Sequence, residues 1–204
     1  MARPRTFDPD DILRETLFLF WRKGYEGTSL SDIEQATGVA RMSLYNLFGD
    51  KERLFEAALE RYISATRTLY EKHLQDGGIA DLEALIGVYA HPERLGPAGN
   101  WGCLMLNAIM ADAGVSPRTR AAIDSFRHDA VARIAATLRR AQALGDVAPE
   151  IDCVEAADFI LAALWGAKAA IRHAGTAEAA APTQRMLGLF LHGLKPGPAH
   201  PSLT

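Results

Sequence analysis

The stretch that most constrains the fold of this chain runs from Thr28 to Phe48, because it contains two short helical patterns joined by a glycine turn. Ser29 is suited to cap the first helix, and Asp32, three residues later, can complete a capping box. Gly38 ends this helix, since glycine takes the left-handed C′ conformation without strain. The residues expected to form the buried faces are Leu30, Ile33 and Ala36 in the first helix and Leu44, Leu47 and Phe48 in the second. Two helices separated by so short a turn predict a helix-turn-helix.

Polar side chains occupy the remaining surface of the second helix, near its N-terminal end. That end of a recognition helix meets base edges in the major groove, where arginine pairs with guanine and asparagine with adenine. Tyr45 and Thr28 are suited to phosphate oxygens, and so is Lys51 in the first turn of the following helix. Taken singly, such residues also occur on any solvated surface, but their order and spacing favour DNA. The candidate DNA-binding residues are Thr28, Ser29, Arg41, Met42, Ser43, Tyr45, Asn46 and Lys51.

Residues 8 to 62 resemble the N-terminal domain of the TetR family of bacterial transcriptional regulators. The matching segments are Lys23-Gly24-Tyr25, Gly27-Thr28-Ser29, Ile33…Ala36…Gly38-Val39, Leu44-Tyr45…Phe48 and Asp50-Lys51…Leu54. The resemblance implies an all-α homodimeric repressor whose larger domain binds a small molecule that loosens it from DNA. Ala40 departs from the family's pattern, because a serine usually caps the recognition helix there, so the cap must come from another residue or be missing. Met42 replaces what is often a small residue.

The net charge limits how the chain can contact DNA. Its 204 residues include 22 Lys or Arg and 25 Asp or Glu, which gives a formal net charge of -3. A chain that bound DNA through bulk charge would be basic, so any contact must come from a local patch. Arg3 and Arg5 lie on an N-terminal arm that is either simply solvated or able to reach an adjacent groove. The hydrophobic content of 49% is typical of a soluble globular protein.

No segment has the pattern of a secretory signal or a membrane span. Leu13 to Trp21 is amphipathic rather than continuously apolar. The run from Phe159 to Ile171 is interrupted by Lys168 and is shorter than the ~20 residues of a bilayer span. The two cysteines, Cys103 and Cys153, do not make a disulfide framework in a chain of this size. We therefore expect a cytoplasmic protein without a membrane partner.

Helical patterns continue almost to the end of the chain. After the first three helices, they cover residues 51–74, 81–89, 101–110, 117–144, 153–173 and 182–194. The sequence thus predicts an all-α fold of about nine helices. We expect a helix-turn-helix DNA-binding domain over residues 1–50, braced by a helix that extends to about 62. A helical effector-binding and dimerisation domain over residues 51–194 and a disordered tail over residues 195–204 complete the expected organisation.

The helix expected from Cys153 to His173 is apolar around most of its circumference, so it needs cover on two sides. One side can be the domain core, and a partner subunit is the obvious second. Together with the last helix, it would form an intermolecular four-helix bundle about a two-fold axis. The predicted interface residues are Ala157, Ile160, Leu161, Leu164, Ala167, Ile171, Met186, Leu187, Phe190 and Leu191. The alternative is that both helices are internal core. A dimer would match a partly palindromic operator with half-sites ~34 Å apart.

Aromatic and methionine side chains between the long linking helix and the later helices can line an effector pocket, or they can be plain core. The candidates are Tyr62, Trp101, Cys103, Met105, Asn107, Met110, Phe126, His128, Phe159 and Trp165. His128 or Asn107 would orient an apolar effector. Cys103, at a helix N-terminus, would have a lowered pKa and act as a sensor of electrophiles or oxidants, as in some TetR-like regulators. The alternative is an inert buried cysteine.

The sequence carries no recognisable catalytic or cofactor-binding motif. It has no Gly-x-Gly-x-x-Gly, phosphate loop, Gly-x-Ser-x-Gly or Cys-x-x-Cys, and its histidines lie outside metal-ligand spacing. We therefore expect a protein that is not an enzyme and that uses no cofactor or metal. The alternative to a DNA-binding regulator is a helical protein-interaction module without a DNA target. In that case Arg41, Ser43, Tyr45 and Asn46 could be changed without functional loss.

Overall fold

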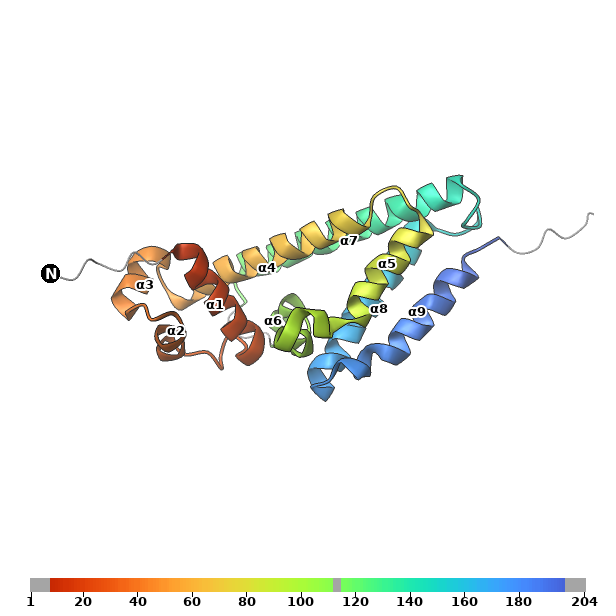
Figure 1. Ribbon diagram of the computed structural model, residues 1–204. Coiled ribbons are helices and arrows are strands. Elements are labelled where there is room, and N and C mark those ends of the chain that lie inside the picture. The colour runs from red at the N-terminus through yellow and green to blue at the C-terminus, as the bar shows by residue number, and fades with distance from the viewer. Residues whose placement is uncertain (1–7, 112–114, 197–204) are drawn as a thin grey trace, which may run out of the picture.

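A computed structural model describes residues 8–111 and 115–196 and shows an all-α chain (Figure 1), as predicted. Within these residues there are nine α-helices and no strand. The helices are α1 (Pro9–Lys23), α2 (Leu30–Thr37), α3 (Arg41–Phe48), α4 (Lys51–His73), α5 (Ile79–Ala90), α6 (Leu104–Ala111), α7 (Pro117–Ala143), α8 (Cys153–Ala174) and α9 (Ala181–Gly193). Two 3-10 segments, η1 (Pro92–Trp101) and η2 (Ala177–Ala180), precede α6 and α9. The predicted N-terminal arm and nearly all of the predicted disordered tail lie outside the described residues.

The helices form an elongated molecule with α1, α2 and α3 gathered at one end (Figure 1). The long helix α4 leads out of this group and packs against α7, while α5, α8 and α9 make up the other end. Asp50 caps the start of α4 by accepting a hydrogen bond from the Arg53 backbone amide at 2.8 Å. A single helix therefore belongs to both ends of the molecule, and it offers a rigid mechanical link between them.

The apolar core is continuous from the helix-turn-helix to the last helix. At the N-terminal end, the rings of Phe20 and Phe55 meet edge to face with centroids 5.0 Å apart, which fixes α1 against α4. The short helices α2 and α3 each bury one apolar residue fully, Ile33 and Leu44. Ala36 and Leu47 are exposed, so their predicted burial was wrong. Helices of eight residues have room for only about one deeply buried side chain on the face that meets the core.

The structure corrects most of the predicted dimer interface. Because α8 lies against α7, α9 and η2 of its own chain, the inward side chains of α8 and α9 are core residues with at most 2% of their surface exposed. These buried residues are Ala157, Ile160, Leu161, Leu164, Ala167, Ile171, Leu187 and Leu191. Only Met186 and Phe190 of the predicted set retain exposed surface. The eight buried residues are therefore not available for contact with a partner subunit.

None of the described helices combines the length and the apolar composition that crossing a bilayer requires.

Candidate nucleic-acid interface and ligand cavity

Helix α2 begins with the capping box that the sequence predicts. The backbone amide of Asp32 donates to Ser29 Oγ at 3.1 Å, and the Asp32 carboxylate accepts from the backbone amide of Ser29 at 2.8 Å. Lys23 Nζ, at the end of α1, lies 2.6 Å from the other carboxylate oxygen. These donors hold the pKa of Asp32 well below its usual range, with the Lys23 hydrogen bond as the largest cause. The same carboxylate thus caps α2 and ties it to α1.

Ala40 occupies the N-cap position of helix α3. Its methyl side chain has no hydrogen-bond acceptor, so it cannot cap the helix. The carboxylate of Glu34 on α2 supplies the cap instead, because it accepts a hydrogen bond from the Arg41 backbone amide at 2.5 Å. Glu34 also lies 4.0 Å from the Arg41 guanidinium. The cap of the recognition helix therefore comes from the preceding helix.

The polar side chains predicted on α3 are all exposed. Arg41, Met42, Ser43, Tyr45 and Asn46 point away from the core, whereas Leu44 between them is buried. Met42 is 71% exposed and is one of several large apolar side chains on the surface of the described chain. An exposed helix N-terminus with arginine, serine and asparagine on one surface can enter a major groove and donate to base edges.

Thr28 does not belong to this surface, and its predicted phosphate contact was wrong. Its side chain is fully buried, and its hydroxyl donates to the carbonyl of Gly24 at 2.8 Å. Thr28 therefore closes the turn between α1 and α2. Ser29 is exposed but uses its hydroxyl in the capping box. Lys51 lies in the first turn of α4 with Nζ 4.3 Å from the centre of the Tyr25 ring, a cation–π contact.

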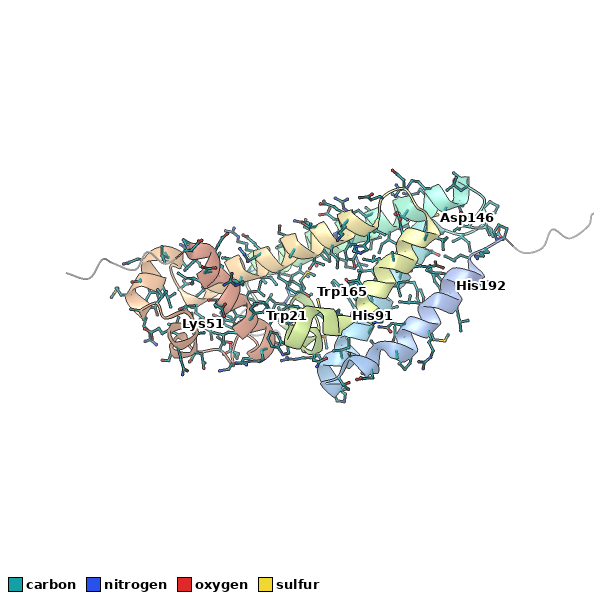
Figure 2. All side chains as sticks on the ribbon, viewed as in Figure 1. Trp21, Lys51, His91, Asp146, Trp165 and His192 are labelled. Carbon is teal, nitrogen blue, oxygen red and sulfur yellow. The ribbon has the colours of Figure 1, made fainter. Side chains whose placement is uncertain are left out.

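A cavity of about 430 Å³ lies between α1 and the C-terminal helices. Figure 2 places Trp21 and Trp165, two of its lining residues, in the middle of the molecule. The lining side chains come from both ends of the molecule: Arg14, Leu17, Phe18 and Trp21 from α1; Arg61, Tyr62, Ala65, Thr66 and Leu69 from α4; Val88 and Tyr89 from α5; and Cys103, Met105, Phe126, Trp165 and Lys168 from the later segments. An occupant would therefore contact the helix-turn-helix group directly.

Of the predicted pocket residues, Tyr62, Cys103, Met105, Phe126 and Trp165 line this cavity. The other five do not, for reasons of geometry. Met110, Phe159 and His128 are exposed. The Nδ1 atom of His128 is hydrogen-bonded to the backbone carbonyl of Asp124. Trp101 packs edge to face against Trp21 from outside the cavity lining, and Asn107 donates to the Trp101 carbonyl at 3.0 Å.

Comparison with known proteins decides the family. The model of the family described as "Bacterial regulatory proteins, tetR family" matches residues 12–58. The model described as "Tetracyclin repressor-like, C-terminal domain" matches residues 78–187, which is more than half of the chain. The HTH-type transcriptional repressor ComR of Escherichia coli K12 is 31% identical over 186 residues, 87% of this chain and 85% of its own length.

The chain belongs to the TetR family.

Solved TetR structures agree with this assignment. A TetR transcriptional regulator from Chloroflexus aurantiacus superimposes with a TM-score of 0.79 at 24% identity, over 89% of this chain and 92% of that one. A cysteine mutant of the TetR family regulator CifR, complexed with 26-bp double-strand operator DNA, has a TM-score of 0.75 at 28% identity, over 92% and 98% of the two chains. As a member of the TetR family, the chain is a DNA-binding transcriptional regulator and not an enzyme. This assignment excludes the alternative of a protein-interaction module without a DNA target.

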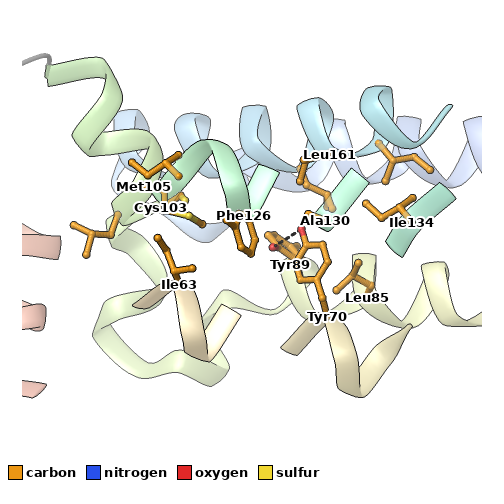
Figure 3. Close-up of a cluster of buried hydrophobic side chains, with 14 of the residues drawn as sticks. Ile63, Tyr70, Leu85, Tyr89, Cys103, Met105, Phe126, Ala130, Ile134 and Leu161 are labelled. Carbon is orange, nitrogen blue, oxygen red and sulfur yellow. Dashed lines mark hydrogen bonds between the residues drawn. The ribbon is translucent and has the colours of Figure 1, made fainter. Parts of the chain in front are cut away.

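Cys103 of this TetR-family chain differs from the prediction. Burial raises the pKa of its thiol, and amide hydrogen bonds from Leu106 and Met105 offset only part of that effect. The predicted lowering of the pKa was therefore wrong, because the sequence shows the helix N-terminus but not the depth of burial. Cys103 lies among buried apolar side chains beside Met105 and Phe126 (Figure 3). Its neutral thiol acts there as part of the cavity wall.

The sequence interpretation missed two kinds of cavity residue in this TetR chain. Leu17, Phe18 and Trp21 were not among the predicted pocket residues, although α1 forms one wall of the cavity. Lys168 was noted only as an interruption of an apolar run. Its buried position in the cavity wall could have been suspected from that interruption, since a lysine on a buried helix face needs a reason.

Proposed function

We propose that this chain is a homodimeric repressor that leaves a partly palindromic operator when a small, largely apolar effector occupies the cavity between α1 and the C-terminal helices. The observation that carries this proposal is the composition of the cavity wall. Four of its residues belong to α1, while Trp165 and Lys168 belong to α8. An effector in this cavity would therefore contact both α1 of the helix-turn-helix group and α8 at the other end of the molecule.

A change in α1 is transmitted to the recognition helix through packed contacts. Helix α1 packs against α2, and the Lys23–Asp32 ion pair joins the two at 2.6 Å. Helix α2 holds the start of α3 through the Glu34 cap. An effector that binds better when α1 is displaced would favour a state with a different α3 position. In a dimer, that displacement changes the spacing of two recognition helices and lowers operator affinity.

Dimerisation is supported by the outward face of α8 and α9. Phe159 and Phe190 contact each other with ring centroids 4.5 Å apart, and Phe159 is 51% exposed. Met186 and Leu189 on α9 are 62% and 64% exposed. A contiguous apolar face of this kind favours a protein partner. A Cβ atom built at Gly166 would meet no atom within 4 Å, so the chain's own packing gives no reason for glycine there.

The direction of regulation and the domain organisation are inferred from the relatives. ComR is named a transcriptional repressor, and we propose the same direction for this chain. The matches over residues 12–58 and 78–187 support a helix-turn-helix domain over residues 1–50, with α4 continuing from it into an effector and dimerisation domain over 51–194.

Selection on random duplex DNA tests the operator and the dimer together. The purified chain should enrich an inverted repeat, and footprinting should show two protected half-sites about one helical turn apart, ~34 Å. Enrichment of a single, non-repeated site would contradict the dimer, and absence of enrichment at low salt would contradict sequence-specific binding. An Arg41→Ala and Asn46→Ala double variant should lose the enrichment while its thermal unfolding is unchanged.

A further inference from the structure

Lys168 stands out among the buried residues of the described chain. The buried polar and charged side chains there are Thr16, Thr28, Thr119, Thr137 and Lys168, and Lys168 is the charged one, with 8% of its surface exposed. It lines the cavity, and its Nζ lies 5.0 Å from the centre of the Tyr89 ring. Burial lowers the pKa of this lysine, because the ammonium has lost much of its hydration.

The cavity has cations in its wall but no acidic residue among its described lining side chains. Arg14 is paired with Asp11 at 2.8 Å, and Arg61 with Asp10 at 3.4 Å. Lys168 forms neither an ion pair nor a hydrogen bond with any residue that the structure describes. The two arginines therefore have counter-ions within the chain, whereas the buried lysine does not.

Two other groups in the cavity wall, the Cys103 thiol and the Trp21 indole, provide no negative charge to pair with Lys168. The thiol of Cys103, which interacts electrostatically with Lys168, is held neutral by its raised pKa and supplies no counter-ion. The indole nitrogen of Trp21, another lining residue, is buried without a hydrogen-bond acceptor among the described residues. The hydroxyl groups of Tyr70 and Tyr89 are already bonded to each other at 3.2 Å (Figure 3).

We propose that the effector is an amphipathic anion, a monocarboxylate whose head group pairs with the Lys168 ammonium while its hydrocarbon body fills the apolar cavity. An unpaired buried cation is costly unless something in the functional cycle pairs with it. The body would lie among Leu17, Trp21 and Leu69 on one side and Phe126 and Trp165 on the other. A cavity of about 430 Å³ accommodates a medium-chain or two-ring molecule. This inference rests on the proposed effector function of the cavity and specifies its ligand class.

Matched ligand pairs test the proposal by direct binding. Decanoate is compared with decanol, and naphthoate with naphthalenemethanol, by calorimetry and by quenching of tryptophan fluorescence from Trp21 and Trp165. The wild-type protein should bind each carboxylate roughly 10- to 100-fold more tightly than its alcohol, the range of a buried charge-assisted contact. Lys168→Met should remove that preference and leave the alcohols bound as before. Lys168→Arg should keep the preference.

Arg61→Met is the matched control, because it removes a cavity cation that already has a carboxylate partner. It should leave the preference largely intact. The proposal is overturned if the alcohols bind as tightly as the carboxylates, if none of the carboxylates binds saturably, or if the preference follows Arg61 instead of Lys168. Operator affinity is measured separately. Carboxylate binding through Lys168 without a change in operator affinity would support the ligand class and contradict effector-driven release.

Discussion

The guanidinium of Arg172 on α8 donates a hydrogen bond to the backbone carbonyl of Arg22 at the end of α1, with a donor–acceptor distance of 3.0 Å. The same nitrogen lies 3.5 Å from the carbonyl of Trp21. A cation at a helix C-terminus is favourable because it complements the unpaired carbonyls and the helix dipole. This contact joins the helix-turn-helix group to α8 one turn beyond Lys168, so the two ends of the molecule meet next to the cavity.

Replacing Arg172 with methionine should weaken this connection. We expect the free energy of unfolding to fall by about 0.5–1 kcal/mol, because Arg172 is exposed and its hydrogen bonds compete with water. A cavity ligand should then change operator affinity less than in the wild type. Denaturant melts and operator titrations with and without ligand measure both effects. Arg139→Met, an exposed arginine on α7, is the control, and an equal effect in both variants would refute the coupling role.

The exposed polar surface of α3 should carry operator recognition. Arg41→Ala is expected to weaken operator binding by about 1–3 kcal/mol per half-site if its guanidinium contacts a base edge. Lys51→Met should weaken binding to all sequences and reduce the salt dependence by about one counter-ion per half-site. Fluorescence anisotropy at several salt concentrations separates the two. Arg139→Ala also removes one positive charge, but far from α3, and it should leave operator affinity nearly unchanged. An equal loss of operator affinity in Arg139→Ala would mean that the net charge of the protein, and not α3, determines binding.

The outward face of α8 should control oligomeric state. Gly166→Leu adds a large side chain where the chain itself leaves open space, and leucine also favours the helix over glycine. The folded protomer should therefore remain intact, while a two-fold partner approaching this face would be blocked at both copies. We expect the dimer dissociation constant to rise roughly 100-fold. Sedimentation velocity measures it, with Ala132→Leu on the exposed surface of α7 as the control. An unchanged dimer would place the interface elsewhere.

The Asp32 carboxylate makes the start of α2 sensitive to acid. Its pKa in the folded chain lies well below the ordinary value of about 3.9, so its contribution to stability is complete above that value and is lost as the pH falls below it. Asp32→Asn should lower the melting temperature near neutral pH, and the difference from the wild type should shrink below about pH 4. Asp124→Asn, which removes an exposed carboxylate on α7, is the matched control. A pH-independent difference would mean that the ion pair is unimportant.

Lys168 should reduce the stability of the ligand-free protein. Its ammonium is buried without a counter-ion among the described residues, so Lys168→Met is expected to raise the free energy of unfolding by about 1 kcal/mol or more. Lys72→Met, on the exposed surface of α4, should have little effect. Differential scanning calorimetry measures both. A destabilised Lys168→Met variant would show that the lysine has a favourable partner in the folded chain.

The sequence by itself determined the local features of this protein. The capping box of Ser29 and Asp32, the glycine turn at Gly38 and the nine helical patterns depend on contacts within a few residues, and each formed as expected. The exposure of the polar side chains of α3 followed from the same periodicity, with Leu44 facing the core, although the burial predicted for Leu47 was wrong.

Only the tertiary structure decided which side of each longer helix faces its own chain. Helix α8 is apolar nearly all round, and periodicity could not say that Leu164 would be core while Phe159 would be exposed. The burial that raises the pKa of Cys103 and the placement of Lys168 in a wall shared with α1 depend on segments distant in the chain. Desolvation is a property of the packed surroundings, and no local pattern encodes it.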